Sequence, residues 1–259
     1  MLDGFKLLRF RVELIEPQQR LALREHPLIT AGVLADLLGR TLALNYDLHY
    51  GLGFDRYHGM ARPRAVALAR DTAQELAREL DRRAALGRQS RDLAHEIVAL
   101  LEPTYAAVDR AVSVGRMLAG TLAETIANCL QQRRRIPTVA VGALTRAVAR
   151  GDSVRALVGA GQLVEALSTQ IAELVGLGEA DQLDLVLLSD LLDDFTRADL
   201  STADLTGVDL AGVRWSELHT CWPEDLDIER LKEDSREIPP GSGIYIVEPG
   251  AETAYVIRV

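Results

Sequence analysis

The spacing of apolar residues follows the 3.6-residue period of an α-helix over most of the first 193 positions. The clearest case starts at Arg64, where one apolar stripe runs opposite a face of charged residues. This stripe consists of Ala65, Leu68, Ala69, Ala73, Leu76, Ala77 and Leu80. The same pattern predicts helices over 29–49, 64–80, 92–102, 104–133, 153–176 and 179–193, and one more that ends near Arg150.

Two stretches near the N-terminus fit this pattern less well. Phe10, Val12 and Leu14 alternate with charged residues, which favours a short strand over 5–15, although a helix fits nearly as well. Glycines and a proline then break the chain into a loop over 50–63. We expect the aromatic residues of this loop to pack it against the helices.

The predicted helix over 104–133 has a small residue at every fourth position. Its small residues are Ala107, Ala111, Gly115, Ala119, Ala123 and Ala127. Residues four apart form one ridge on a helix, and a ridge of small side chains lets a second helix approach closely. We expect this ridge to pack inside a helical bundle. The alternative is a homodimer interface formed by Ala111, Gly115, Ala119 and Ala123.

The period changes from 3.6 to five residues at Phe195. Three consecutive Asp-Leu pairs follow at a spacing of five, at 199–200, 204–205 and 209–210. This segment, about 195–216, resembles the pentapeptide-repeat family, in which four pentapeptides form one square coil of a right-handed β-helix. The resemblance implies that Leu200, Leu205, Leu210 and Trp215 point inward as the core of a single coil. A single coil must be covered at both ends, because stacked repeats normally bury one another.

The C-terminal residues predict a β-hairpin. Residues 244–247 and 255–257 are rich in Ile, Val and Tyr and flank Pro249-Gly250. This tail also resembles the C-terminal part of uncharacterised actinobacterial proteins, some of them large regulatory or defence-associated chains. The expected fold is therefore mainly α, with a helical domain over 1–194 and a second domain over 195–259 that holds the coil and the hairpin.

Charge and composition narrow the choice of surroundings and partners. The net charge is −9, but residues 1–150 hold 22 Lys and Arg against 16 Asp and Glu, whereas the remaining residues hold 7 against 22. The basic excess of the first part is mild for a DNA-binding domain. The N-terminus lacks the apolar run of a signal peptide, and no stretch of 18 uncharged apolar residues predicts a membrane span. We therefore expect a cytoplasmic protein that does not enter a membrane.

No sequence motif predicts catalysis. The chain has no Gly-rich phosphate loop, no GxSxG motif and no paired cysteine ligands, so we expect no cofactor and no metal ion. The leading hypothesis is a non-enzymatic protein–protein interaction or regulatory module that binds another protein or a second copy of itself. One alternative is a nucleic-acid-linked protein, in which the basic half binds DNA or the acidic repeat imitates it. The other is an enzyme with an unfamiliar site in the loop between Tyr46 and His58.

Overall fold

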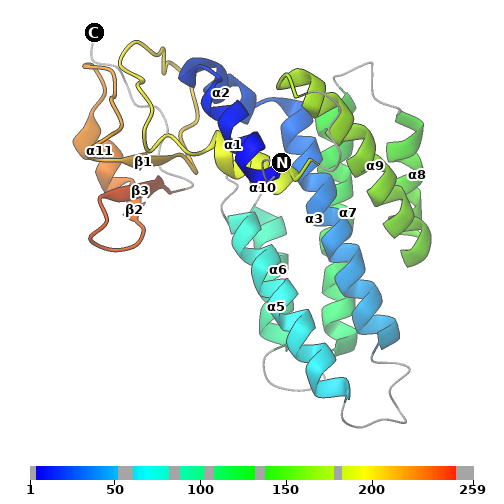
Figure 1. Cartoon of the computed structure of the whole chain (residues 1–259). Coiled ribbons are helices and arrows are strands. Elements are labelled where there is room, and N and C mark those ends of the chain that lie inside the picture. Colours follow the sequence, from blue (N-terminus) through cyan, green and yellow to red (C-terminus); the bar gives the residue numbers. More distant parts are fainter. Residues whose placement is uncertain are drawn as a thin grey trace. The chain divides into compact units, whose positions relative to one another are not determined.

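The computed structural model describes residues 4–51, 61–81, 88–101, 108–131, 138–177 and 183–248. Within these residues the chain is mainly helical and ends in a small three-stranded antiparallel sheet (Figure 1). The described residues form two units, each with its own core. Unit 1 combines residues 4–29 and 183–248, and unit 2 runs from Thr30 to Leu177.

This division differs from the expected boundary after residue 194. The first two helices belong with the C-terminal segment, because both contact the last helix before the repeats and the second one contributes a side chain to the core of that segment. Leu21, for example, is buried in the same hydrophobic cluster as Phe195 and Leu200. The expected domain over 1–194 is therefore divided between the two units. The chain starts in unit 1, forms unit 2 and then returns to unit 1.

Unit 2 is a helical bundle. Its elements are α3 (Pro27–Tyr46), the π-helix η1 (Asp47–Gly51), α5 (Ala61–Asp81), α6 (Arg88–Leu101), α7 (Val108–Gln131), α8 (Thr138–Ala149) and α9 (Ser153–Leu174). From α5 to α9, each helix packs against the next in the sequence. As its sequence predicts, α9 begins after Asp152, whose side chain accepts a hydrogen bond of 3.2 Å from the backbone N–H of Arg155. The large buried core residues include Leu34, Leu37, Leu38, Leu80, Ile97, Leu118 and Leu122.

Helix α3 is the one described helix that is long and apolar enough to be compared with a membrane span. The segment Pro27–His49 could cross a bilayer by its length and composition, with a mean hydropathy of 1.4 over its best window. Charged residues interrupt it, and two of them, Asp36 and Arg40, are ion-paired with each other at 2.8 Å. Because 61% of that window is buried inside the protein, α3 has the burial of a core helix.

Unit 1 contains four helices and three short strands. The helices are α1 (Gly4–Glu13), α2 (Pro17–Arg24), α10 (Leu185–Leu192) and α11 (Ile228–Glu233), and the strands are β1 (Arg214–Ser216), β2 (Ser235–Glu237) and β3 (Ile244–Val247). The central strand β3 pairs antiparallel with both β1 and β2, so that Tyr245 lies opposite Trp215 on one side and Glu237 on the other. Helices α1 and α2 both contact α10.

Two predictions about secondary structure change. The strand expected over 5–15 is wrong: this segment forms α1, because Leu8 and Val12, four residues apart, are buried on one helical face. Phe10, which would share a strand face with them, is exposed. The expected hairpin partner, 255–257, lies outside the described residues. Since β3 already has a neighbour on each side, the described sheet pairs it with other strands than the one expected.

Candidate functional site

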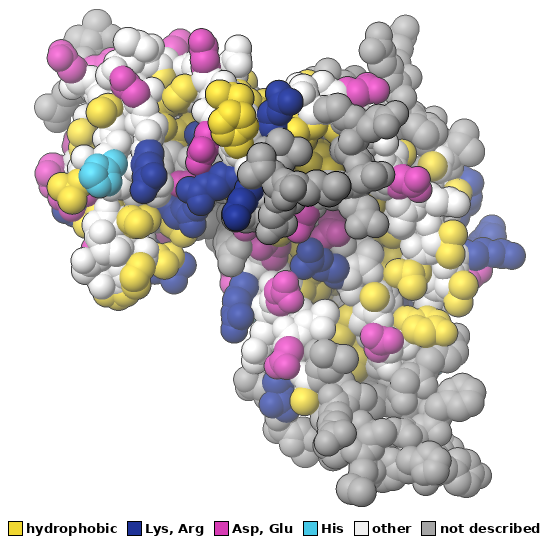
Figure 2. Space-filling view, in the orientation of Figure 1, with side chains coloured by type: hydrophobic (Ala, Val, Ile, Leu, Met, Phe, Trp, Pro, Cys, Tyr) yellow, Lys and Arg dark blue, Asp and Glu magenta, His cyan; other side chains and the backbone are white. Residues whose placement is uncertain are grey.

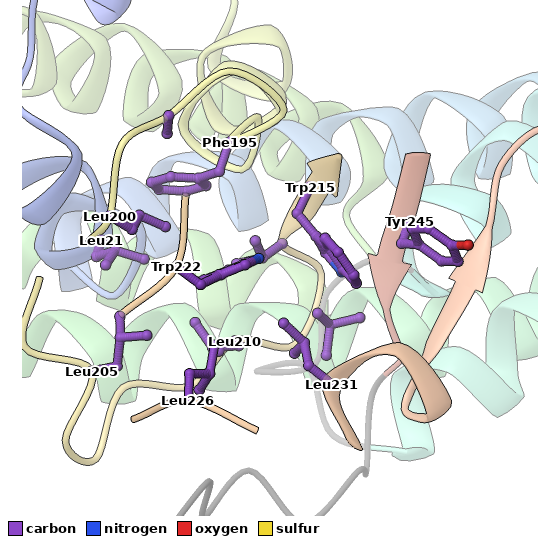
Figure 3. Packing of buried hydrophobic residues seen from close by; sticks show 13 residues of the cluster. Leu21, Phe195, Leu200, Leu205, Leu210, Trp215, Trp222, Leu226, Leu231 and Tyr245 are labelled. Carbon is purple, nitrogen blue, oxygen red and sulfur yellow. The ribbon is translucent and has the colours of Figure 1, made fainter. Parts of the chain in front are cut away.

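The inward residues expected for the repeat are core residues. Leu200, Leu205, Leu210 and Trp215 are all buried in one hydrophobic cluster (Figure 3). Trp215 stacks on Tyr245 with ring centroids 4.8 Å apart, and it meets Trp222 edge-to-face at 6.0 Å. Because Trp215 also belongs to β1, its large ring joins the core of the repeat segment to the sheet. These four residues therefore stabilise unit 1 and are not available to a ligand.

The backbone of this segment repeats every five residues. The N–H groups of Ala198, Ala203, Val208 and Val213 each donate to the carbonyl three residues earlier, at 2.9 to 3.1 Å. The side chains of Asp194, Asp199, Asp204 and Asp209 each accept a hydrogen bond from the N–H two residues later. Such bonds are typical of Asx turns, which explains why the repeat uses aspartate at this position. Gly207 and Gly212, at the ends of two repeats, have φ angles of 71° and 82°, which favour glycine.

The chain returns beside its own start after twenty residues. Asp194 and Arg214 form a parallel β-bridge, in which the N–H of Phe195 donates to the carbonyl of Arg214 at 2.8 Å. The side chains of Asp194 and Arg214 also form an ion pair at 2.7 Å. Burial raises the pKa of Asp194, but hydrogen bonds from Thr196 and Arg214 outweigh this effect and place the pKa below its usual value. The carboxylate of Asp194 is thus ionised where the two passes of the chain meet.

Helix α2 covers the repeat segment with polar side chains. The amide of Gln18 donates to the backbone carbonyl of Asp204 and accepts from its N–H, at 3.2 and 3.0 Å. Arg24 donates to the carbonyls of Asp209 and Ala211, at 2.9 and 2.8 Å, and Glu25 accepts from the N–H of Asp209 at 3.0 Å. These backbone groups would otherwise lack a protein partner at the edge of the segment. No sequence pattern predicts that α2 bonds to the repeat segment, because the residues involved are about 185 positions apart.

The small-residue ridge of α7 packs inside unit 2. Ala111, Gly115, Ala119 and Ala123 are all buried, in agreement with the expectation of dense bundle packing. The approach is closest at Gly115, where an added Cβ would lie 2.8 Å from Cγ and Nδ2 of Asn45 on α3 and closer still to Oδ1. A ridge with this burial has no exposed surface for a second copy of the chain.

A groove lies next to this ridge, between α7 and the end of α8. It has a volume of about 490 Å³, and its wall includes Gly120 and Ala123 of α7 and Ala149 of α8. A Cβ built at Gly120 would meet nothing within 4 Å, so the groove is open above this residue. Met117 also lines the groove, and 52% of its surface is exposed. The groove therefore presents apolar surface beside small residues.

The loop between Tyr46 and His58 falls mostly outside the described residues. The π-helix η1 holds Asp47 and His49, whereas Asp55 and His58 lie outside the described residues. The adjacent Asn45 is 5% exposed, and neither polar atom of its amide has a hydrogen-bond partner among the described residues. The described part of this region thus offers a buried amide and no assembled catalytic group.

Candidate metal ligands do not gather in the part of the chain that the structure describes. No group of three His, Cys, Asp or Glu residues there could hold a metal ion. His219 and Cys221, which are two positions apart in the sequence, are both exposed. The chain matches no family model, no curated protein and no solved structure, so its residues and geometry alone must support a functional assignment.

Proposed function

We propose that this chain is a non-enzymatic protein–protein interaction module that receives an apolar helix of a partner protein in the α7/α8 groove. The observation that carries the proposal is the open space above Gly120, next to the exposed residues Met117 and Ala149. Small side chains let a helix approach closely. Exposed methionine suits such a surface, because its flexible and polarisable side chain adapts to different partners.

The charges around the groove favour a partner helix with acidic flanks. Arg116 and Arg150 line the groove together with one acidic residue, Glu124. The two arginines attract acidic side chains at the rim, where charge steers association and sets orientation. Apolar contact with Met117 and the floor of the groove would supply most of the affinity.

Site-specific photocrosslinking tests this proposal. A photoreactive phenylalanine analogue replaces Met117 in the full-length chain, which is expressed in its native host cells. We expect a discrete crosslinked protein that disappears when Gly120→Leu fills the groove. Gly161→Leu is the matched control, because Gly161 of α9 also has open space around its Cβ position but does not line the groove. An unchanged crosslink with Gly120→Leu, or no crosslink at Met117, would refute the assignment.

We also propose that residues 194–216 form one coil of the pentapeptide-repeat type. Its support is the parallel bridge between positions twenty residues apart, the four turns with a period of five, and the inward Leu residues. In this proposal α2 is the cap that ends the stack on one side. The coil is then a folded support for the module.

Two insertions of different length test the coil proposal. The short insertion adds the five residues Ala-Asp-Leu-Thr-Gly after Gly207, so that the coil has five repeats and its end no longer lies beside its start. The long insertion adds four copies of the same repeat, twenty residues, so that the chain makes one further complete coil and its end lies beside an earlier pass again. We expect the short insertion to unfold unit 1 and the long insertion to preserve the fluorescence of its buried tryptophans. Equal damage by both insertions would contradict a coil with a four-repeat return.

A further inference from the structure

A cavity of about 340 Å³ lies within unit 1, where α1 and α2 meet the first turn of the repeat segment. Val12, Ile15 and Leu191 give it apolar walls. Its volume is within the range of small-molecule sites, about 300–1,000 Å³. Figure 2 shows Lys and Arg side chains gathered in a band on this unit, running from β1 toward α10. The cavity thus combines apolar walls with charged residues of both signs, three arginines and three carboxylates.

Arg20 is the buried cation of this cavity. The residue is only 7% exposed, and its guanidinium lies over the ring of Phe195 at 4.3 Å from the ring centre. Its Nη2 donates to the backbone carbonyls of Leu191 and Asp194, which caps the C-terminal end of α10. These two hydrogen bonds involve only one of the three guanidinium nitrogens, Nη2. Its Nε is buried and has no hydrogen-bond partner among the described residues.

The carboxylates near Arg20 do not neutralise it. Burial lowers the pKa of Arg20, and this effect outweighs the attraction of Asp194, Glu13 and Asp193. Within the described chain no carboxylate oxygen lies within ion-pair distance of its guanidinium, since its hydrogen bonds go to neutral carbonyls. Arg20 is thus a buried cation near three carboxylates, none of which forms an ion pair with it in the described chain, so a ligand anion within hydrogen-bond distance would be favourable.

The other charged groups of the cavity largely cancel in pairs. Arg9 and Glu13 of α1 form an ion pair at 2.9 Å. Asp194 is paired with Arg214. Arg197 is exposed, lines the cavity, and has no ion-pair partner in the described parts of the chain.

One anion opposes the two unpaired arginines. Asp199 lines the cavity, and hydrogen bonds from the side chain and then the backbone N–H of Ser201 lower its pKa and keep it ionised. Because Asp194 is paired with Arg214, which lies outside the cavity wall, Arg20 and Arg197 leave one positive charge in excess over Asp199. The first residue of α2, Pro17, is also in the wall, so the positive end of that helix dipole borders the cavity.

We propose that this cavity binds a small molecule through an oxyanion, a carboxylate or a phosphate group, held by Arg20 and Arg197. Arginine suits both groups, because its planar fork donates two parallel hydrogen bonds to them. The apolar walls at Val12 and Ile15 contact the rest of the molecule. This ligand site is separate from the α7/α8 groove and belongs to the other unit.

Calorimetric and thermal titrations of the full chain test the proposal. The probes are inorganic phosphate and malonate, each compared with chloride at equal ionic strength up to millimolar concentrations. Both tryptophans of the chain, Trp215 and Trp222, lie in the core of unit 1, so their fluorescence reports the melting of that unit. We expect one probe to bind saturably and to raise the melting temperature, since a ligand that binds only the folded state stabilises it. The stronger probe identifies the ligand as a phosphate or a carboxylate.

Two variants decide whether the binding occurs at this cavity. Arg197→Gln removes an exposed charge, so the variant is expected to fold and to bind the probe at least tenfold more weakly. Arg236→Gln is the matched control, because Arg236 is an exposed arginine of the same unit that does not line the cavity. No saturable binding of either probe, or equal binding by Arg197→Gln and the native chain, would overturn the proposal.

Discussion

Replacement of Gly115 by alanine tests how tightly α3 and α7 pack. The new Cβ would overlap the amide of Asn45, with Cγ and Nδ2 at 2.8 Å. Real Cβ contacts at this distance are essentially never seen, so Asn45 or one of the helices must move. Overpacking of a core of this kind typically costs about 1–3 kcal/mol.

A second effect of the same substitution has the opposite sign. Alanine favours a helix over glycine by about 0.8–1 kcal/mol. We therefore expect Gly115→Ala to destabilise unit 2 by up to about 2 kcal/mol in total. Gly120→Ala in the same helix is the control, because its Cβ meets nothing within 4 Å. That variant should become more stable by about 0.5–1 kcal/mol.

The assay is urea unfolding of the full chain followed by circular dichroism at the helical band. Asn45→Ala completes a double-mutant cycle, because it removes both the overlap and a buried amide without a described partner. We expect Gly115→Ala to be tolerated in the Asn45→Ala background, with a coupling energy of about 1–2 kcal/mol between the two sites. If Gly115→Ala stabilises the chain as much as Gly120→Ala does, the close approach of the two helices is wrong.

Four further predictions concern the stability of the two units. Ala119→Leu should destabilise unit 2 by about 1–3 kcal/mol with an unchanged mass in light scattering, because the ridge is internal; a change of mass with intact helices would instead indicate a subunit interface. Leu205→Asp should unfold unit 1 by placing an unpaired carboxylate in its core, and an unchanged tryptophan signal would contradict the core assignment. Arg24→Ala should destabilise unit 1 by roughly 1.5–3 kcal/mol, measured by tryptophan fluorescence in urea, because the charged cap is lost. Because the pKa of Asp194 is lowered in the folded state, its carboxylate stabilises the fold above the unfolded pKa of about 3.9 and loses this effect as the pH falls through the folded pKa. The stability difference between the native chain and Asp194→Asn should therefore shrink from pH 6 to pH 3. A constant difference would refute this role of Asp194.

Periodic patterns predicted the parts of the fold that depend on local spacing. The stripe of apolar residues at 65–80 indicated α5, and Asp152 indicated the start of α9, because both effects act within a few residues. The resemblance to pentapeptide repeats likewise implied that Leu200, Leu205 and Leu210 point inward, and all three are buried in one cluster. Each of these predictions depends on residues that are close together in the sequence.

The errors arose where distant residues decide the structure. Phe10, Val12 and Leu14 alternate as in a strand, but the packing of Leu8 and Val12 in unit 1 selects a helix. Nothing near Gln18 or Arg24 indicates that they bond to the backbone of the repeat segment. The α7/α8 groove and the cavity at Arg20 were also missed, since a concave surface forms only when separate elements meet.

The contacts of α2 with the repeat segment impose an order on folding during translation. Arg20 and Arg24 bond to residues 169 to 187 positions later in the chain. At a synthesis rate of about 5–20 residues per second, α2 leaves the ribosome roughly 10 to 35 seconds before its partners. Residues 30–177, which form unit 2, are synthesised in that interval, while Leu8, Val12 and Leu21 still lack the C-terminal residues of their own unit. Unit 1 can therefore complete its core only after both of its chain segments have left the ribosome.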